Sequence, residues 1–559
     1  MRKTIGLLAF VLIGSSCAPP PPAGASSEAG LIPAPVRNWT YPESPKGTIS
    51  DDYHGTRVDD PYRWLEDPAS VETKAWVAAQ NVLTRSVLDA IPARDKIRDR
   101  LTELWNYPRY EDLEKHGEHY YFFLNDGLQD QAVLYRQAGL SAEPEVVMDP
   151  NTFSDDGTTA LGTMEYSWDG RFLAYGKNAA GSDWGTLHIR DLLTGRDLPE
   201  SFDNMRYTGL AWNRANTGFY YNKYPDPGTV PEEDNYHFQR VFWHQLGTPI
   251  SSDRLVFEMP TEKDLSFYPQ ITDDGDYLVL WVYRGTDDRY GLYYRPVDGK
   301  GEFVHLFEVE QAQYRYIGNT GSTFYIHTDE AAPRGRVISL DINAPGNHSE
   351  LIAEGQDVIS DVNLFGGQLM VRYMVDAHEV IKQYGLDGTF VRDLPLPTDG
   401  SLDDLSGGVD DQEMFFSFTS FLYPTTIYRY DFAAASLEVF RQPEIDFNFK
   451  DYQTTQVFYP SKDGTQVPMF LTHKKRLELN GDNPVLLYGY GGFNISILPG
   501  FQPRRLVLIE NGFIFALANI RGGSEYGEDW HQAGMLDRKQ NVFDDFIAAG
   551  EWLIEQGYT

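Results

Sequence analysis

The sequence predicts a chain of the β plus α/β class, in which a seven-bladed β-propeller is followed by an α/β domain. Length is the first reason, because 559 residues exceed the size at which a single hydrophobic core stops growing, about 250–300 residues. The second is a repeat. Between residues 106 and 445, a turn rich in Asp, Gly and Asn leads into a hydrophobic strand about every 45–50 residues. The third is a change of pattern after residue 446, where strands begin to alternate with helical segments.

The first 17 residues have the features of a secretory signal peptide. Arg2 and Lys3 precede an apolar run at residues 5–13, and small residues follow it. A basic start, a short apolar run and a small-residue exit are typical of such signals, and this run is too short to span a bilayer. We therefore expect an exported protein. We expect residues 18–40, rich in Pro, Ala, Gly and Ser, to be a flexible linker.

Cys17, the single cysteine of the chain, resembles the lipidated cysteine of a bacterial lipoprotein signal. The resemblance implies lipidation at Cys17, a place in the bacterial periplasm or envelope, and membrane contact through this lipid anchor alone. Gly14 stands where such signals usually have leucine, and cleavage after Ala25 would instead release a soluble protein. A single cysteine also excludes an intramolecular disulfide and a cysteine-based metal site.

The charge balance argues against a nucleic-acid partner. The chain has 47 Lys and Arg residues against 82 Asp and Glu residues, a formal net charge of −35. Such a surface repels phosphate backbones, and no basic stripe in the sequence opposes that repulsion. We expect no cofactor and no bound metal, and we expect a monomer.

Residues 41–105 precede the propeller as a segment of loops and helices. Apolar residues recur at helical spacing over residues 72–88 and again over residues 97–104, which predicts two helices. The loop at residues 53–67 combines aromatic and acidic side chains, but nothing in it demands catalysis.

Seven strands of similar pattern predict the seven blades. They lie at residues 120–124, 168–175, 218–221, 274–281, 322–327, 367–371 and 413–418. Each contains or follows a turn of Asp, Gly or Asn, and the long period between them is typical of propeller blades. A pair of β-sandwiches is the alternative, but its turn signals would recur about every 8–12 residues. The propeller is therefore expected over residues 106–445.

Residues 446–559 predict the first part of an α/β domain. Four strands are expected at residues 454–459, 467–473, 485–488 and 513–520. A helix is expected to begin with Asn541 as its N-cap and to end before Gly557. Its predicted apolar face consists of Phe543, Phe546, Ile547, Leu553 and Ile554.

No nucleophile elbow of the form G-x-S-x-G occurs in the chain. The nearest match is the run of residues 522–527, where Tyr526 takes the place of the second glycine and no helical pattern follows Ser524. We interpret Ser524 as a turn residue. In an α/β sheet of this type a strand and a serine elbow would come next, so we expect a fragment of a longer polypeptide that is inactive by itself.

Five segments resemble the prolyl oligopeptidase family of serine peptidases, and they occur in that family's order. They are YHGTRVDDPYRWLED (53–67), FWHQLGTPISSDRLVFE (242–258), YGYGGFNIS (488–496), ANIRGGSEYGEDWHQAG (518–534) and NVFDDFIAAGEWLIEQGYT (541–559). The resemblance covers residues 41–559. His531, in the fourth segment, matches a loop of the family and not its catalytic histidine, so we assign it no catalytic role.

The resemblance implies a propeller that caps an α/β-hydrolase domain, with residues 41–105 packed on that domain. It implies an acyl-enzyme mechanism in which a Ser-Asp-His triad, expected after residue 559, cleaves short proline-containing peptides on the carboxyl side of proline. The propeller would exclude large folded substrates.

The resemblance also implies roles for five residues. Tyr490, the second tyrosine of the YGYGGF motif, would donate a hydroxyl to the oxyanion, a charge that develops only in the transition state. Phe493 would line the proline pocket, where an aromatic ring offers a flat apolar face. On the propeller, Arg284 and Thr286 lie where the family holds substrate carbonyls, and Ile189 lies where an apolar pocket residue is expected.

Two other functions stay open at this point. An oligopeptidase B-like enzyme would share the fold but cleave after Arg or Lys; its counterpart of YGYGGF is usually less aromatic. A non-catalytic propeller that binds peptides is the alternative from another class. A G-x-S-x-G-G motif encoded shortly after codon 559 would favour the peptidase.

Overall fold

The computed structural model describes residues 39–299 and 301–559. The predicted signal peptide, Cys17 and nearly all of the linker at residues 18–40 lie outside the described residues. The chain divides into two compact units, one ending at Arg94 and the other running from Asp95 to Thr559. None of the helices in the described residues is both long and apolar enough to cross a membrane.

The first unit contains a hairpin and a long helix. Its elements are β1 (Ser50–Tyr53), β2 (Thr56–Asp59), the 3₁₀ helix η1 (Arg63–Glu66) and α1 (Val71–Leu88). Ser70 caps α1, because its hydroxyl accepts a hydrogen bond of 3.1 Å from the backbone N–H of Thr73. The helix predicted over residues 72–88 is confirmed.

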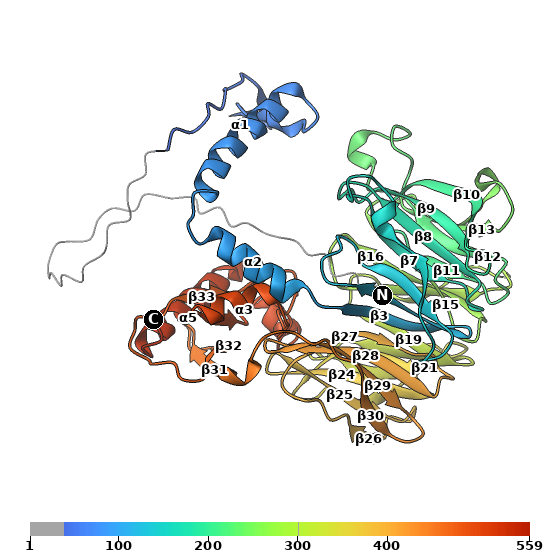
Figure 1. The fold of residues 1–559 in the computed structure, drawn as a ribbon. Helices are drawn as coiled ribbons and strands as arrows, with labels where there is room; N and C mark the ends of the chain where they lie inside the picture. The colour runs from blue at the N-terminus through green and yellow to red at the C-terminus, as the bar shows by residue number, and fades with distance from the viewer. Residues whose placement is uncertain (1–38, 300) are drawn as a thin grey trace. The chain divides into compact units, whose positions relative to one another are not determined.

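The propeller consists of seven four-stranded antiparallel sheets in the second unit (Figure 1). Blade 1 contains β3 (Arg109–His116), β4 (His119–Asn125), β5 (Val133–Gln137) and β6 (Glu145–Met148). Blade 2 contains β7 (Ala160–Tyr166), β8 (Phe172–Asn178), β9 (Gly185–Asp191) and β10 (Arg196–Met205). Blade 3 contains β11 (Leu210–Trp212), β12 (Gly218–Lys223), β13 (Arg240–Gln245) and β14 (Arg254–Phe257). Blade 4 contains β15 (Leu265–Ile271), β16 (Tyr277–Arg284), β17 (Gly291–Pro296) and β18 (Val304–Phe307).

The last three blades follow the same order. Blade 5 contains β19 (Tyr314–Thr320), β20 (Thr323–Thr328), β21 (Arg336–Asp341) and β22 (His348–Ile352). Blade 6 contains β23 (Val358–Phe365), β24 (Gln368–Val375), β25 (His378–Tyr384) and β26 (Phe390–Asp393). Blade 7 contains β27 (Ser401–Ser406), β28 (Glu413–Ser420), β29 (Tyr423–Asp431) and β30 (Ser436–Arg441). The seven predicted strands all fall on the second strand of a blade, so the predicted seven-bladed propeller is confirmed.

The recurring Asp-Gly turn has a physical reason, which blade 4 shows clearly. The hydroxyl of Thr272 donates to Asp274 (2.6 Å) and accepts from the backbone N–H of Tyr277 (3.0 Å). Gly275, in this turn, has a φ of +79°, a conformation that favours glycine. The side chains thus replace backbone partners at the entrance to β16 and fix where the strand begins.

The cores of the propeller lie between neighbouring blades. Between blades 2 and 3, Trp212 and Phe172 stack with ring centroids 5.9 Å apart, and Trp212 is almost fully buried. The ring closes between blade 7 and blade 1 through side chains. The hydroxyl of Ser406 donates to the carbonyl of Leu113, and Lys115 pairs with Asp411 at 3.2 Å. Blades 1 and 7 are each complete, so no strand is shared across this seam.

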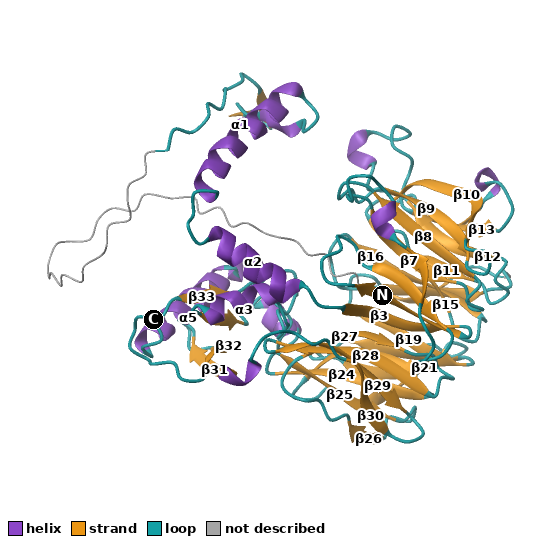
Figure 2. Ribbon diagram, in the orientation of Figure 1, coloured by secondary structure: helices purple, strands orange, loops and turns teal. Residues whose placement is uncertain are grey.

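The α/β part follows the propeller (Figure 2). Its strands are β31 (Tyr452–Pro460), β32 (Gln466–Lys474), β33 (Val485–Tyr488) and β34 (Ile514–Ala518). Its helices are α3 (Pro503–Glu510), α4 (Glu528–Gln532) and α5 (Gln540–Glu555). The sheet order is β31-β32-β34-β33, and β33 and β34 pair in parallel. The short 3₁₀ helices of the second unit are η2 (Pro150–Thr152), η3 (Glu232–Asp234), η4 (Ile250–Ser252), η5 (Phe449–Asp451) and η6 (Leu536–Arg538).

Helix α2 (Arg94–Trp105) confirms the second helix predicted in the N-terminal segment. Arg100 pairs with Glu510 of α3 at 2.6 Å, and Leu104 is buried in the core that contains Phe515. This end of the segment therefore packs on the α/β part. The packing of residues 41–94 stays a prediction.

Two predictions about α5 are wrong. The helix begins at Gln540, and Asn541 does not cap it; the Asn541 side chain donates instead to the carbonyl of Ala533 at 2.9 Å. The predicted apolar face is also wrong for four of its five residues. The exposed fractions are 54% for Phe543, 37% for Phe546, 56% for Ile547 and 64% for Ile554. The helix instead buries the face that contains Asp545 and Leu553, because Asp545 pairs with a buried arginine.

Candidate functional site

Tyr490 lies in the loop that follows β33, between two glycines. A Cβ on Gly491 would lie 2.6 Å from a methyl carbon of Val542 and 2.7 Å from the carbonyl oxygen of Arg521, and its φ is +63°. Only glycine fits there, so the loop can turn sharply at the end of the strand. Tyr490 is half-buried, and its hydroxyl has no hydrogen-bond partner in the described part of the chain. A free phenol at a strand end can donate to a ligand.

Phe493 lies in the same loop and is 72% exposed. It has a φ of +53° and Asn494 has a φ of +54°, a left-handed conformation that is unusual for non-glycine residues. Hydrogen bonds hold this turn in place. The N–H of Asn494 donates to the carbonyl of Gly522 (3.1 Å), and Lys539 donates to that of Gly491 (2.6 Å). Strained backbone persists where its surroundings fix it, and such sites are often functional.

Arg284 ends β16 and is already surrounded by carboxylates. It pairs with Glu262 at 3.1 Å, Glu310 at 3.3 Å and Asp264 at 3.4 Å. The hydrogen bond with Glu262 is the main reason that the pKa of its guanidinium is raised. To hold a substrate carbonyl, the arginine would have to release at least one of these partners.

Thr286 is exposed in the loop at residues 285–290, which connects β16 to β17. The same loop contains Asp288, whose carboxylate accepts a hydrogen bond from the side chain of Asn494. The structure therefore brings the loop that contains Thr286 against the loop that contains Phe493.

Ile189 lies in β9 and has no exposed surface. It packs in the core between blades 2 and 3, next to Ala174 and Phe202. Packing accounts for this residue in the structure, and its contact with a substrate stays a prediction.

Ser524 lies in a bend, as the sequence suggested. Its hydroxyl is 2.9 Å from the hydroxyl of Ser496, and its carbonyl accepts from the N–H of Gly527 at 3.0 Å. Among the described residues, no histidine forms a hydrogen bond with the Ser524 hydroxyl.

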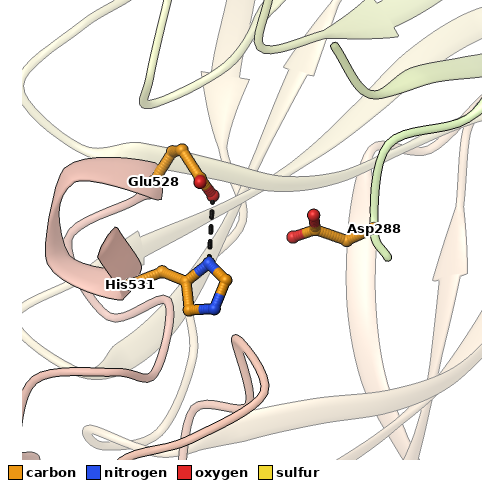
Figure 3. Close-up of side chains that lie close together, drawn as sticks. All are labelled: Asp288, Glu528 and His531. Atoms are coloured by element: carbon orange, nitrogen blue, oxygen red, sulfur yellow. Dashed lines mark hydrogen bonds and ion pairs between the residues drawn. The ribbon is translucent and has the colours of Figure 1, made fainter. Parts of the chain in front are cut away.

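Sequence reasoning missed a cluster of three side chains, which consists of Asp288, Glu528 and His531. Glu528 and His531 lie one turn apart on α4, and Oε2 of Glu528 is 3.3 Å from Nδ1 of His531 (Figure 3). Asp288 faces them from the propeller, and ligand atoms of all three lie within 4.8 Å of one another. The E-x-x-H spacing of residues 528–531 was the available signal, because residues three apart share a helix face.

The pKa values of this cluster reflect its charges. The hydrogen bond with Glu528 is the main cause that raises the pKa of His531, and the charges of Asp288 and Asp287 add to it. Burial acts to raise the pKa of Glu528, but hydrogen bonds from His531 and Gln532 outweigh burial and lower it. Both shifts favour the charged forms.

Glu525 lies in the segment between β34 and α4 and is only 2% exposed. It accepts hydrogen bonds from the N–H of Ile497 (3.2 Å) and the side chain of Asn519 (3.3 Å). Burial raises its pKa to about 7. Its second carboxyl oxygen and the side-chain oxygen of Asn519 have no other partner in the described chain, so a proton on Glu525 could satisfy both.

A family model described as the N-terminal beta-propeller domain of prolyl oligopeptidase matches residues 42–443, and a second model for the prolyl oligopeptidase family matches residues 499–559. The chain belongs to the prolyl oligopeptidase family. The relatives are named prolyl endopeptidases and oligopeptidases, which are serine peptidases, so the protein is a peptidase of this family. Its propeller with a short α/β-hydrolase-like region is the fold of the family.

Similar proteins of the family include two prolyl peptidases. The prolyl endopeptidase of Elizabethkingia meningoseptica is 38% identical over 524 residues, which are 93% of this chain and 74% of that protein. Prolyl oligopeptidase A of Galerina marginata is 33% identical over 563 residues, which are 94% of this chain and 76% of that protein.

Solved structures of the family agree with this result. One comes from a study of two prolyl endopeptidases and the role of inter-domain dynamics in catalysis and specificity. It has a TM-score of 0.88 at 34% identity, and the match covers 93% of this chain and 77% of the chain in that structure. Prolyl oligopeptidase B of Galerina marginata, bound to a 35mer hydrolysis and macrocyclization substrate, has a TM-score of 0.86 at 28% identity with the same coverages. Its structures include separate mutants in which a histidine, a serine or an aspartate is replaced by alanine.

Proposed function

We propose that this chain is the larger part of a serine endopeptidase that hydrolyses short peptides on the carboxyl side of proline. One observation carries the proposal: the loop after β33 holds a free phenol at Tyr490 and an exposed aromatic ring at Phe493, three residues apart. The names of the relatives support proline as the preferred residue, since several are called prolyl endopeptidase or prolyl oligopeptidase.

The two side chains suit different parts of such a reaction. When a nucleophile attacks the peptide carbonyl, its oxygen becomes negative, and the Tyr490 hydroxyl can donate to that oxygen. Phe493 can place its ring against the proline ring of the substrate, as apolar rings pack on aromatic faces. Thr286, on the facing propeller loop, offers a hydroxyl to the substrate backbone. Arg284 could also donate to a substrate carbonyl, but it would first have to release one of its carboxylate partners.

The nucleophile, its base and the orienting acid are proposed to be a Ser-Asp-His triad supplied by polypeptide that follows residue 559. This chain covers 74% of the prolyl endopeptidase of Elizabethkingia meningoseptica, so that relative contains further sequence. The alanine mutants of prolyl oligopeptidase B at a serine, an aspartate and a histidine are consistent with such a triad in that protein. An acyl-enzyme mechanism follows from a serine nucleophile.

Hydrolysis of chromogenic peptides tests the proposal. The chain of 559 residues should not hydrolyse a Gly-Pro-linked substrate, whereas the polypeptide extended through a downstream serine elbow should. Turnover by the short chain that disappears in Ser524→Ala would contradict the triad assignment. Faster cleavage after Arg or Lys by the extended protein would indicate an oligopeptidase B-like enzyme, and no cleavage of any substrate would indicate a peptide-binding propeller.

The protein is further proposed to be exported to the bacterial periplasm or envelope, with a lipid on Cys17. Support comes from the sequence alone: two basic residues, the apolar run at residues 5–13 and the cysteine just after it.

A further inference from the structure

We propose that Asp288, Glu528 and His531 form a binding site for a divalent transition-metal ion of the zinc type, and that the ion links the propeller to the α/β part. The sequence pattern does not join Asp288 to the other two residues, because Asp288 lies in blade 4 and Glu528 and His531 lie on α4. The fold brings their ligand atoms within 4.8 Å of one another, and all three residues are half-buried (Figure 3).

The distances fit a zinc site after a small movement. Zinc binds nitrogen and oxygen ligands at about 2.0–2.2 Å, so ligand atoms at the corners of a tetrahedron lie about 3.4 Å apart. Nδ1 of His531 and Oε2 of Glu528 already have nearly this separation, at 3.3 Å. Only Asp288 has to approach, and its side chain projects from a loop rather than from a strand.

The donor atoms select the class of metal. An imidazole nitrogen with two carboxylates suits zinc and similar divalent ions, and three protein ligands leave a position for water. Calcium and magnesium require six or more oxygen ligands in most sites and do not prefer imidazole. The site contains no sulfur, so ions that prefer thiolates are disfavoured.

The surrounding charges favour a cation. Asp287 adds a third carboxylate near His531, but its charge is engaged by Arg289, at 2.8 Å. The carboxylates of Glu528 and Asp288 and the imidazole of His531 have ligand atoms within 4.8 Å of one another, and a divalent ion bound among them would neutralise both negative charges.

Asn494 contacts the cluster through Asp288. Its side-chain nitrogen donates to the carboxylate of Asp288, and this hydrogen bond joins the propeller loop at residues 285–290 to the loop that contains Phe493. An ion bound at Asp288 would therefore also be coupled to the loop that contains Phe493.

Zinc binding by the whole chain tests the proposal. Cys17→Ala removes the single thiol, and in this background zinc is titrated against a chromophoric chelator, without an affinity tag. We expect one site per chain, with an affinity that falls at least about tenfold in His531→Gln and in Asp288→Asn, because even indirect partners of zinc typically matter by 10–100-fold. Asp287→Asn is the matched control and should retain the affinity to within about threefold, since it changes the same loop charge without removing a ligand.

Hydrogen exchange supplies a readout that folding defects would not imitate. Zinc should slow exchange in both residues 285–290 and α4, and calcium or magnesium at the same concentration should not. Variants that keep the circular dichroism spectrum of the parent qualify for comparison. Zinc affinity that is unchanged in His531→Gln would contradict the site. Protection of α4 that persists in Asp288→Asn would contradict the link between the two parts.

Discussion

Replacing Asp545 by asparagine should strongly destabilise the α/β part, although the two side chains differ by only one heavy atom. Asp545 has no exposed surface, and its carboxylate accepts hydrogen bonds from four donor groups. The donors are the hydroxyl of Ser461 (2.5 Å) and three groups of Arg521: its backbone N–H (3.0 Å), Nε (2.9 Å) and Nη2 (2.6 Å). Asparagine has one acceptor oxygen and would turn an N–H₂ group toward these donors.

The magnitude follows from burial. Breaking a buried ion pair by removing one partner typically costs about 3–5 kcal/mol, because the other charge stays buried. Arg521 keeps a second partner, Asp463, at 2.5 Å, so the lower end of this range applies, about 3 kcal/mol. Asp463→Asn is the matched control. The side chain of Asp463 is 48% exposed, and an ion pair of that kind contributes about 0–1 kcal/mol.

Hydrogen exchange of β32 and β34 measures the effect separately from the propeller, since local opening reports the stability of the unit that opens. In Asp545→Asn, exchange in these strands should accelerate by about a hundredfold, the equivalent of about 3 kcal/mol. In Asp463→Asn it should change by less than about fivefold. Unchanged protection in Asp545→Asn, or an equal loss in both variants, would refute the reasoning.

The remaining predictions concern the site and its surroundings. In the extended protein, Tyr490→Phe should lower kcat/KM about 10²–10³-fold without changing the affinity for a product peptide, because the lost donor acts in the transition state; an unchanged kcat/KM would make Tyr490 a packing residue. Phe493→Ala should raise KM and reduce the preference for proline over alanine, and equal effects on both substrates would argue against a proline pocket. The pKa of Glu525 is raised from 4.5 to about 7 by burial, so its contribution to stability is complete below pH 4.5 and is lost as the pH rises through 7. The parent protein should therefore lose about 3 kcal/mol of unfolding free energy between these pH values, whereas Glu525→Gln should not. If unfolding free energy depends equally on pH in both proteins, Glu525 is not the source of the loss. Tagged palmitate should label the parent protein in cells and not Cys17→Ala, and equal labelling would exclude lipidation of this cysteine.

The propeller was predictable because each blade repeats a local signal. The turn that contains Thr272, Asp274 and Gly275 satisfies its own hydrogen bonds, so it leaves the same pattern in the sequence wherever it recurs. The loop with Tyr490 and Phe493 was also found from the sequence, through a motif in which glycine is required by close contacts.

Long-range pairs of polar residues could not be predicted from one sequence. The hydrophobic pattern of α5 suggests that Phe543 and Ile547 face inward, yet they are more than half exposed while Asp545 is buried. The reason is Arg521, which follows β34 and pairs with Asp545 inside the protein. Asp288 and His531 meet only because blade 4 and α4 are neighbours, and no spacing in the sequence reveals that contact.

The seam between blades 1 and 7 has a consequence for how such genes can change. Many rings are closed by a blade whose strands come from both ends of the segment, but here every blade is encoded by one uninterrupted stretch of sequence. Duplication or deletion of one such stretch would add or remove a complete blade without leaving an unpaired strand. Recombination can therefore change the number of blades, and with it the width of the ring, in whole steps.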